Sequence, residues 1–138
     1  MIKIVYSNEV LKVSPNIENK FLKARLREGD VLLTLVGSTG LTYVVPKKHE
    51  GLNLARAVAV IRPNSLITPE WINICLGSIT TAHFLDSRAN TTVQKTINLS
   101  DVKKIPIPLP PACERKVIEN IAGNLSDKIL NCTEQNET

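Results

Sequence analysis

INLSDVKKIPIPLPPACERKVIENI, residues 97–121, holds the signals that decide the fold of this 138-residue chain. Proline fixes φ near its extended value, lacks an N–H donor and biases the preceding residue away from helix. The prolines at 106, 108, 110 and 111 therefore predict that residues 105–111 run extended along a sheet edge or surface. A helix can begin only after Pro111, and Glu114 then places negative charge in its first turn. The stretch predicts a globular domain joined to a helix that leaves it.

The predicted helix carries a narrow apolar stripe. Its apolar residues recur at spacings of three and four, which is the pattern of a coiled-coil seam. The seam consists of Val117, Ile118, Ile121, Leu125 and Ile129. We predict a helix over residues 113–130 and a frayed polar tail over 131–138. A helix of this length is marginal in isolation, so the seam is expected to meet a partner helix or, alternatively, to pack back onto its own domain.

Upstream of the prolines, short apolar runs alternate with turn signals. The pattern predicts strands at 31–36, 41–45, 56–62 and 92–97, the first of them buried on both faces. Thr68 followed by Pro69 and Glu70 predicts a helix start, with Gly77 interrupting the helix before a second segment that reaches Leu85. The expected fold class is α/β (α+β): a small mixed or antiparallel sheet with a few helices, followed by a protruding amphipathic helix.

Composition and charge narrow the class of protein. Hydrophobic residues make up 43% of the chain and charged residues 22%, as in globular proteins. No secretory signal, membrane-length apolar run or disulfide-type cysteine pattern is visible, so we expect a cytoplasmic protein. The net charge of +4 is uneven, with 14 basic and 8 acidic residues through Ala112 against 3 and 5 from Cys113 onward. A basic domain joined to a slightly acidic helix suits a nucleic-acid face combined with a protein-facing arm.

Catalytic and metal-binding signals are weak. Neither His49 nor His83 has a second ligand at metal spacing, so no metal site is predicted. A Cys75/His83 pair is the only candidate nucleophile and base, and a core cysteine beside a surface histidine is the simpler interpretation. The glycine loop at 37–40 lacks the lysine of a phosphate-binding loop. Because no adenosylmethionine or ATP motif is visible, we expect neither a methyltransferase nor a nuclease.

Binding residues are better represented. Two polar clusters and a glycine loop carry the side-chain types that contact phosphates and base edges. The candidate DNA-binding residues are Ser38, Thr39, Lys47, Lys48, His49, Arg56, Arg88, Asn90, Thr91, Thr92, Gln94 and Lys95. The cluster from Arg88 to Lys95 is expected to have little competing acid. The alternative is that both clusters are ordinary solvated loops and that Arg56 is structural.

Together these motifs resemble the specificity subunit of type I restriction–modification systems. The order "LREGDVLLTLVGSTG", "NLARAVAVIRP", "ITPEWINICLGS", "TTVQKTINLSDVKKI" and then "IPIPLPP–x–x–E" covers roughly residues 26–130. The resemblance implies a target recognition domain at 1–112, incomplete on its amino-terminal side, and the start of the conserved spacer helix at 113–130. A whole family subunit has two such domains and two spacers, so the chain resembles a fragment, a truncated product or a half-subunit.

The resemblance also implies a function and partners. The chain would be a non-catalytic component that selects a half-site in double-stranded DNA. It would direct a modification (methyltransferase) subunit and a restriction subunit, which would bring S-adenosylmethionine and ATP with Mg²⁺, and it would hold no cofactor itself. Pairing through the last helix could also give a homodimer. The alternative is a helix-pairing interaction module that does not bind DNA.

Overall fold

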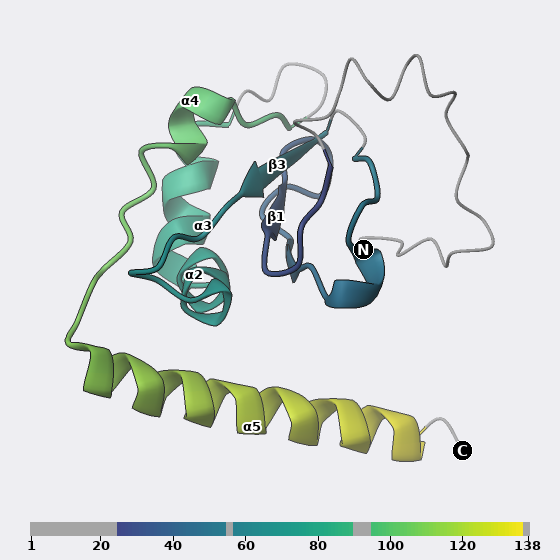
Figure 1. Cartoon of the computed structure of the whole chain (residues 1–138). Coiled ribbons are helices and arrows are strands. Elements are labelled where there is room, and N and C mark those ends of the chain that lie inside the picture. Colours follow the sequence, from purple (N-terminus) through teal and green to yellow (C-terminus); the bar gives the residue numbers. More distant parts are fainter. Residues whose placement is uncertain (1–24, 55–56, 90–94, 137–138) are drawn as a thin grey trace.

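The structure, a computed structural model, describes residues 25–54, 57–89 and 95–136. It has a body built on a small sheet, with helices packed on one side, and a long C-terminal helix that touches the body near its beginning and extends below it (Figure 1). An extended segment connects the two parts. This architecture confirms the predicted fold class.

The sheet has three antiparallel strands in the order β2-β1-β3. β1 (Val31–Thr34) is central, and β2 (Thr42–Val44) and β3 (Val58–Ile61) flank it. Each strand lies within a predicted one and is shorter. The backbone of Leu35 already bonds to Ala57 outside β3, with the Leu35 N–H 2.8 Å from the Ala57 oxygen.

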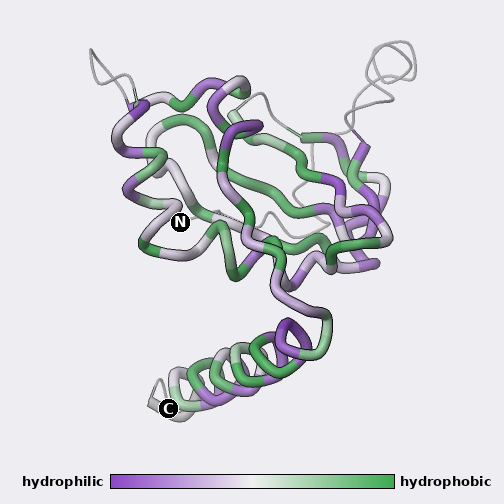
Figure 2. The backbone as a smooth tube through the Cα atoms, turned by 90° about the vertical axis from the view of Figure 1, so that its left-hand side faces the viewer, coloured by the Kyte–Doolittle hydropathy of each residue, from purple (hydrophilic) through white to green (hydrophobic). Residues whose placement is uncertain are grey.

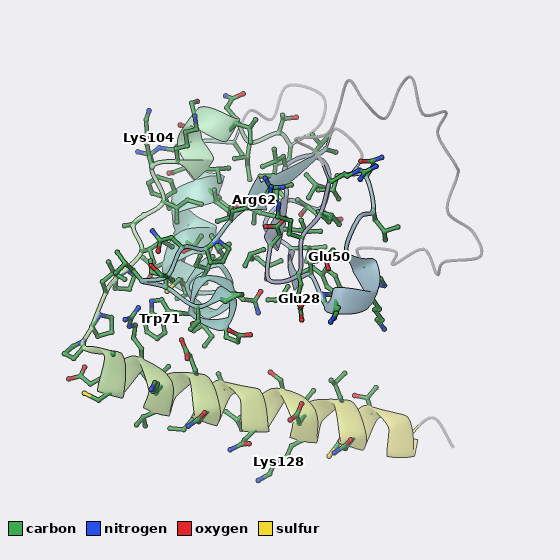
Figure 3. All side chains as sticks on the ribbon, in the orientation of Figure 1. Glu28, Glu50, Arg62, Trp71, Lys104 and Lys128 are labelled. Carbon is green, nitrogen blue, oxygen red and sulfur yellow. The ribbon has the colours of Figure 1, made fainter. Side chains whose placement is uncertain are left out.

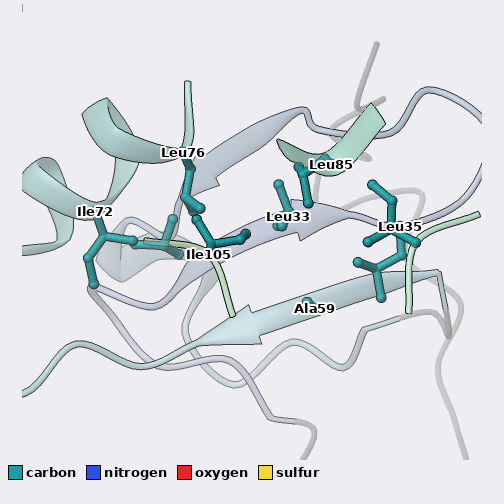
Figure 4. Close-up of a cluster of buried hydrophobic side chains, with 9 residues drawn as sticks. Leu33, Leu35, Ala59, Ile72, Leu76, Leu85 and Ile105 are labelled. Atoms are coloured by element: carbon teal, nitrogen blue, oxygen red, sulfur yellow. The ribbon is translucent and has the colours of Figure 1, made fainter. Parts of the chain in front are cut away.

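β1 is buried on both faces, as its continuous apolar run predicts. Val31 and Leu33 face a cluster formed with α2, α3 and the segment at 97–105, whereas Leu32 faces the opposite cluster with Leu26 and Val45. Figure 4 shows the first cluster, in which Leu33 lies among side chains from both helices and from β3. The alternation of side chains along a strand therefore distributes one apolar run between two small cores.

The two short helices begin where their capping residues dictate. α2 (Pro69–Leu76) starts after Thr68, whose hydroxyl accepts a hydrogen bond from the Trp71 N–H at 3.2 Å. α3 (Ile79–Asp86) starts after Ser78, whose hydroxyl caps it in the same way. Both the predicted start at Thr68 and the predicted interruption at Gly77 are confirmed. The second cap explains why the chain resumes a helix so soon after the break.

The extended segment is tied to the body at its middle. It follows α4 (Leu99–Val102), a single turn that starts after Asn98. The four prolines keep residues 105–111 out of both helix and sheet. Within this segment Ile105 is buried in the core, and the Pro108 oxygen accepts a hydrogen bond from the indole N–H of Trp71 at 2.9 Å.

The last helix is longer than predicted. α5 runs from Ala112 to Asn136, so the expected frayed tail from residue 131 is wrong through residue 136. The polar run Asn131–Asn136 holds no glycine or proline that would end a helix. None of the helices in the described part of the chain is long and apolar enough to span a membrane. Figure 2, in which α5 is seen close to end-on, shows that the helix carries both polar and apolar residues.

An ion pair between the exposed Arg62 and the buried Asp30 joins one end of β1 to the end of β3. Asp30 is 3% exposed, and its carboxylate accepts hydrogen bonds from the Arg27 N–H at 2.9 Å and from Arg62 Nε at 3.2 Å. Arg62 also donates to the Arg25 oxygen at 2.7 Å. A buried carboxylate needs such partners, because an unpaired one is strongly destabilising.

Leu33→Ala is expected to lower the free energy of unfolding by about 2–5 kcal/mol, because it leaves a cavity beneath α2 and α3. Urea denaturation followed by circular dichroism would measure this loss. Leu130→Ala is the matched control: the side chain of Leu130 is 62% exposed, so we expect a change within about 0.5 kcal/mol. Equal effects of the two substitutions would contradict the assignment of the core.

Candidate nucleic-acid interface

The loop between β1 and β2 is held in one shape by Thr34. Its hydroxyl donates to the Ser38 oxygen and accepts a hydrogen bond from the Leu41 N–H at 3.0 Å. Gly37 and Gly40 have φ values of 75° and 86°, which other residues rarely adopt. The loop therefore presents Ser38 at the surface, with Thr39 beside it half-buried.

The segment that contains Lys95 lies directly beside this loop. The Gly37 N–H donates to the Lys95 oxygen at 3.0 Å, and Val36 and Thr96 form an antiparallel bridge. Two candidate groups that are far apart in the sequence therefore meet at one end of the sheet.

The basic residues at this end have acidic partners. Lys95 forms an ion pair with Asp86, and Arg88 lies 3.8 Å from the carboxylate of Asp101. The Arg88 guanidinium also stacks 3.9 Å from the centre of the Phe84 ring. The expectation of little competing acid is therefore wrong, because one acid ends α3 and the other belongs to α4. DNA phosphates would have to compete with both carboxylates here.

Lys47, Lys48 and His49 form a short 3-10 helix, η2 (Lys47–His49), at the opposite end of the sheet. Both lysine side chains are exposed, and no acid lies within ion-pair distance of either in the part of the chain that the structure describes. His49 is less available, because its Nδ1 lies 2.9 Å from the hydroxyl of Tyr43. Burial raises the pKa of that hydroxyl.

The candidate residues therefore form two groups rather than one patch. About seven residues of chain separate Asp30, near η2, from Gly37, near Lys95, which is at most roughly 23 Å at about 3.3 Å per residue. One phosphate cannot meet both groups. A duplex lying along β1 would present roughly seven base pairs over that length, at about 3.4 Å per pair.

Several candidates lie outside the described residues. They are Arg56, Asn90, Thr91, Thr92 and Gln94, and the first half of the strand predicted at 92–97 lies there as well. Their placement in the site stays a prediction.

The sequence interpretation overlooked a polar cleft of about 400 Å³ beside Asp30. Two arginines line it, Arg27 and Arg62, together with the turn that leads from β3 to α2. The cleft opens at the same end of the sheet as η2, because Val45 at the end of β2 hydrogen-bonds to Gly29 and Asp30. Arg27 is exposed and adds a basic side chain to this end. The signal in the sequence was an arginine beside the turn "EGD", a pattern that by itself indicates only a turn.

The geometry offers no support for a catalytic pair. Cys75 lies on α2 and is 7% exposed, whereas His83 lies on α3 at the surface. Burial raises the pKa of the Cys75 thiol, which lowers its thiolate fraction. Among the described residues no group of three or more histidine, cysteine or acidic side chains could hold a metal ion.

The seam of α5 is exposed along its length. Its five side chains are between 41% and 66% exposed. The residues of α5 that are half-buried near the body are Arg115, Glu119 and Ala122. At 3.6 residues per turn, this stripe is rotated about a quarter of a turn from the seam. The described part of the body therefore does not cover the seam.

Comparison with known proteins identifies the protein family that this chain matches. Residues 1–137 match the family model described as "Type I restriction modification DNA specificity domain". The chain is 33% identical over 112 residues to the type I restriction enzyme EcoBI specificity subunit of Escherichia coli. It is 27% identical over 125 residues to the EcoEI specificity subunit of the same organism. These matches cover 80% and 84% of this chain but only 23% and 21% of the relatives.

A solved structure shares the fold. The HsdS subunit from Thermoanaerobacter tengcongensis aligns with a TM-score of 0.66 and 24% identity. The alignment covers 80% of this chain and 29% of that one.

Cys75 is expected to resist alkylation in the folded chain, while Cys113 and Cys132 on α5 react readily. Burial and the raised pKa both slow attack by Cys75, whereas the other two thiols are exposed. Mass spectrometry after a timed iodoacetamide reaction, with and without denaturant, would measure the difference. Cys113 is the internal control, and a Cys75 that reacts as fast as Cys113 would revive the catalytic interpretation.

Proposed function

The chain belongs to the type I restriction–modification DNA specificity domain family, and on that premise we propose that it recognises a DNA half-site without performing catalysis itself. The family match over residues 1–137 is the observation that carries the proposal. It spans the body as well as α5, so it includes both groups of candidate DNA-binding residues.

The charge distribution supports the proposal. Lys47, Lys48 and Arg27 are exposed at one end of the sheet, and Ser38 and Lys95 lie at the other. Exposed lysines without acidic partners are suited to neutralise phosphates, whereas the glycine loop allows close approach of a backbone. We infer that η2 supplies phosphate contacts. At the other end, the cations of Lys95 and Arg88 are already paired with carboxylates. We infer that this end makes contacts that fix the position and register of the protein on the DNA.

The partners follow from the relatives. Two relatives are named as specificity subunits of type I restriction enzymes. We infer that this chain joins a modification subunit, which would bring S-adenosylmethionine, and a restriction subunit, which would bring ATP and Mg²⁺. We assign no cofactor to the chain itself. Its proposed location is the cytoplasm.

The chain spans between a fifth and a quarter of the length of these relatives. We propose that the exposed seam of α5 completes the assembly by pairing with a second helix, which can belong to a second copy of the chain. A second candidate function, favoured by the same exposed seam, is a helix-pairing module that does not bind DNA.

Selection from a random duplex library at low salt, followed by a salt titration on the enriched duplexes, tests the proposal directly. Enrichment of a short motif would support half-site recognition. Salt-sensitive binding without enrichment would leave backbone contacts only. No binding, also with a modification subunit present, would favour the helix-pairing module.

Lys47→Ala combined with Lys48→Ala is expected to weaken DNA binding and to reduce the salt dependence. The slope of log K against log salt should fall by about 0.9 for each phosphate that the protein no longer neutralises. Fluorescence anisotropy at several salt concentrations would measure it.

Lys116→Ala combined with Lys128→Ala removes two exposed lysines of α5 and should leave the slope unchanged, so it is the matched control. Adding Arg88→Ala and Lys95→Ala should weaken binding further, because Asp86 loses its ion-pair partner, Asp101 keeps only Lys104 at 4.0 Å, and both carboxylates then repel DNA more strongly. An unchanged affinity and slope in the fourfold variant would contradict the DNA-binding proposal.

Ile121→Asp combined with Leu125→Asp is expected to abolish self-association, because each substitution places a charge in the middle of the seam. Sedimentation velocity over a range of concentrations would report the dimer and its loss. Leu130→Asp is the control: this side chain is equally exposed but lies outside the seam. A chain that stays monomeric at every concentration, or a dimer that survives the double substitution, would argue against pairing through α5.

A further inference from the structure

Among the residues that the structure describes, α5 contacts the body near its beginning. Arg115 and Glu119, one turn apart, face the loop and the helix start that follow β3. From Gly123 to Thr133 every side chain of α5 is exposed. Figure 1 shows the consequence: the helix is attached at one end and extends beneath the body toward η2. A small change at the attachment would therefore move the far end of α5 by a large distance.

The first attachment uses one hydroxyl for two purposes. Thr68 Oγ1 accepts from the Trp71 N–H, which caps α2, and donates to the Glu119 carboxylate. A hydroxyl has one proton to donate and can accept at the same time, so neither contact excludes the other. The carboxylate also lies at the positive end of the α2 dipole, which favours negative charge there.

The second attachment is made by Arg115. Its guanidinium donates to the Leu66 oxygen at 2.8 Å. The Leu66 N–H is itself held at 3.0 Å by the side chain of Asn64. The acceptor therefore belongs to a turn that is already ordered, and Arg115 binds a fixed point rather than a flexible loop.

The connection into α5 supplies a third point. The indole of Trp71, which is 4% exposed, donates to the Pro108 oxygen three residues before Pro111. Prolines on both sides restrict the backbone there. Trp71, Thr68 and Leu66 all lie within one short stretch of the body, so α5 is attached to this one stretch (Figure 3 labels Trp71 beside α5).

We propose that Arg115 and Glu119 are positioning residues that set the direction in which α5 leaves the body, so that the body and the helix move as one unit. Removing the hydrogen bonds of Arg115 and Glu119 leaves the hydrogen bond from Trp71 to the Pro108 oxygen, about which the helix can swing. If the proposed function holds, the joint fixes the recognition surface relative to whatever the seam of α5 binds. The joint itself does not depend on DNA binding.

A distance measurement between the body and the far end of α5 tests the proposal. Spin labels at Cys132 and at Glu50→Cys, in a Cys113→Ser background, report how far η2 lies from the end of the helix. Cys75 is buried and stays unlabelled. The labelled chain is mixed with excess unlabelled chain, so that double electron–electron resonance measures distances within one molecule.

The background protein should give a single narrow distance peak. Arg115→Ala combined with Glu119→Ala should replace it with a broad distribution, while the melting temperature of the body stays unchanged. Glu119→Gln should keep the narrow peak, because its amide oxygen still accepts from Thr68. Asp127→Ala removes an exposed acid of α5 that makes no hydrogen bond or ion pair with the described residues, and it should also keep the peak.

A narrow peak at an unchanged distance in the double variant would overturn the proposal. So would a large fall in the melting temperature of the body, since the two residues would then serve folding rather than direction. Because no DNA is present, either result stands apart from the outcome of the selection experiment.

Discussion

The burial of β1 on both faces is the constraint on which the rest of the structure depends. A central strand with apolar side chains on both sides needs a cover over each of them. α2 and α3 cover one face, together with Ile97 and Ile105 from the segment that leads to the prolines. The chain around Leu26, Val45 and Leu52 covers the other. Since the cover includes Ile105, the core also fixes where the extended segment begins, and through it where α5 can start.

The sheet also determines what the polar residues can do. Its antiparallel order places the β1–β2 loop and Lys95 at one end and η2 at the other. The two ends differ in electrostatics: at one end each cation has a carboxylate within reach, and at the other Lys47 and Lys48 have none among the described residues. A basic net charge alone would not reveal this difference. It arises because Asp86 and Asp101 come to the same end of the sheet from separate helices.

Local signals predicted the fold well and the site less well. The β1 run, the Thr68 cap and the proline stretch each act within a few residues, and the structure has all three where the sequence places them. The Asp30–Arg62 pair and the acidic partners of Arg88 and Lys95 join residues from different elements, which no local pattern reports. The predicted end of α5 is wrong for another reason: polar composition alone does not end a helix, and nothing in Asn131–Asn136 breaks one.

The double use of the Thr68 hydroxyl limits how this chain can vary in sequence. Aspartate is as good a helix cap as threonine, but at this position it would bring a second carboxylate against Glu119. Alanine would remove both hydrogen bonds at once. Only a side chain that accepts and donates together, such as serine, threonine or asparagine, satisfies both helices. Positions 68 and 119 are therefore expected to change together during evolution, although 51 residues separate them along the chain.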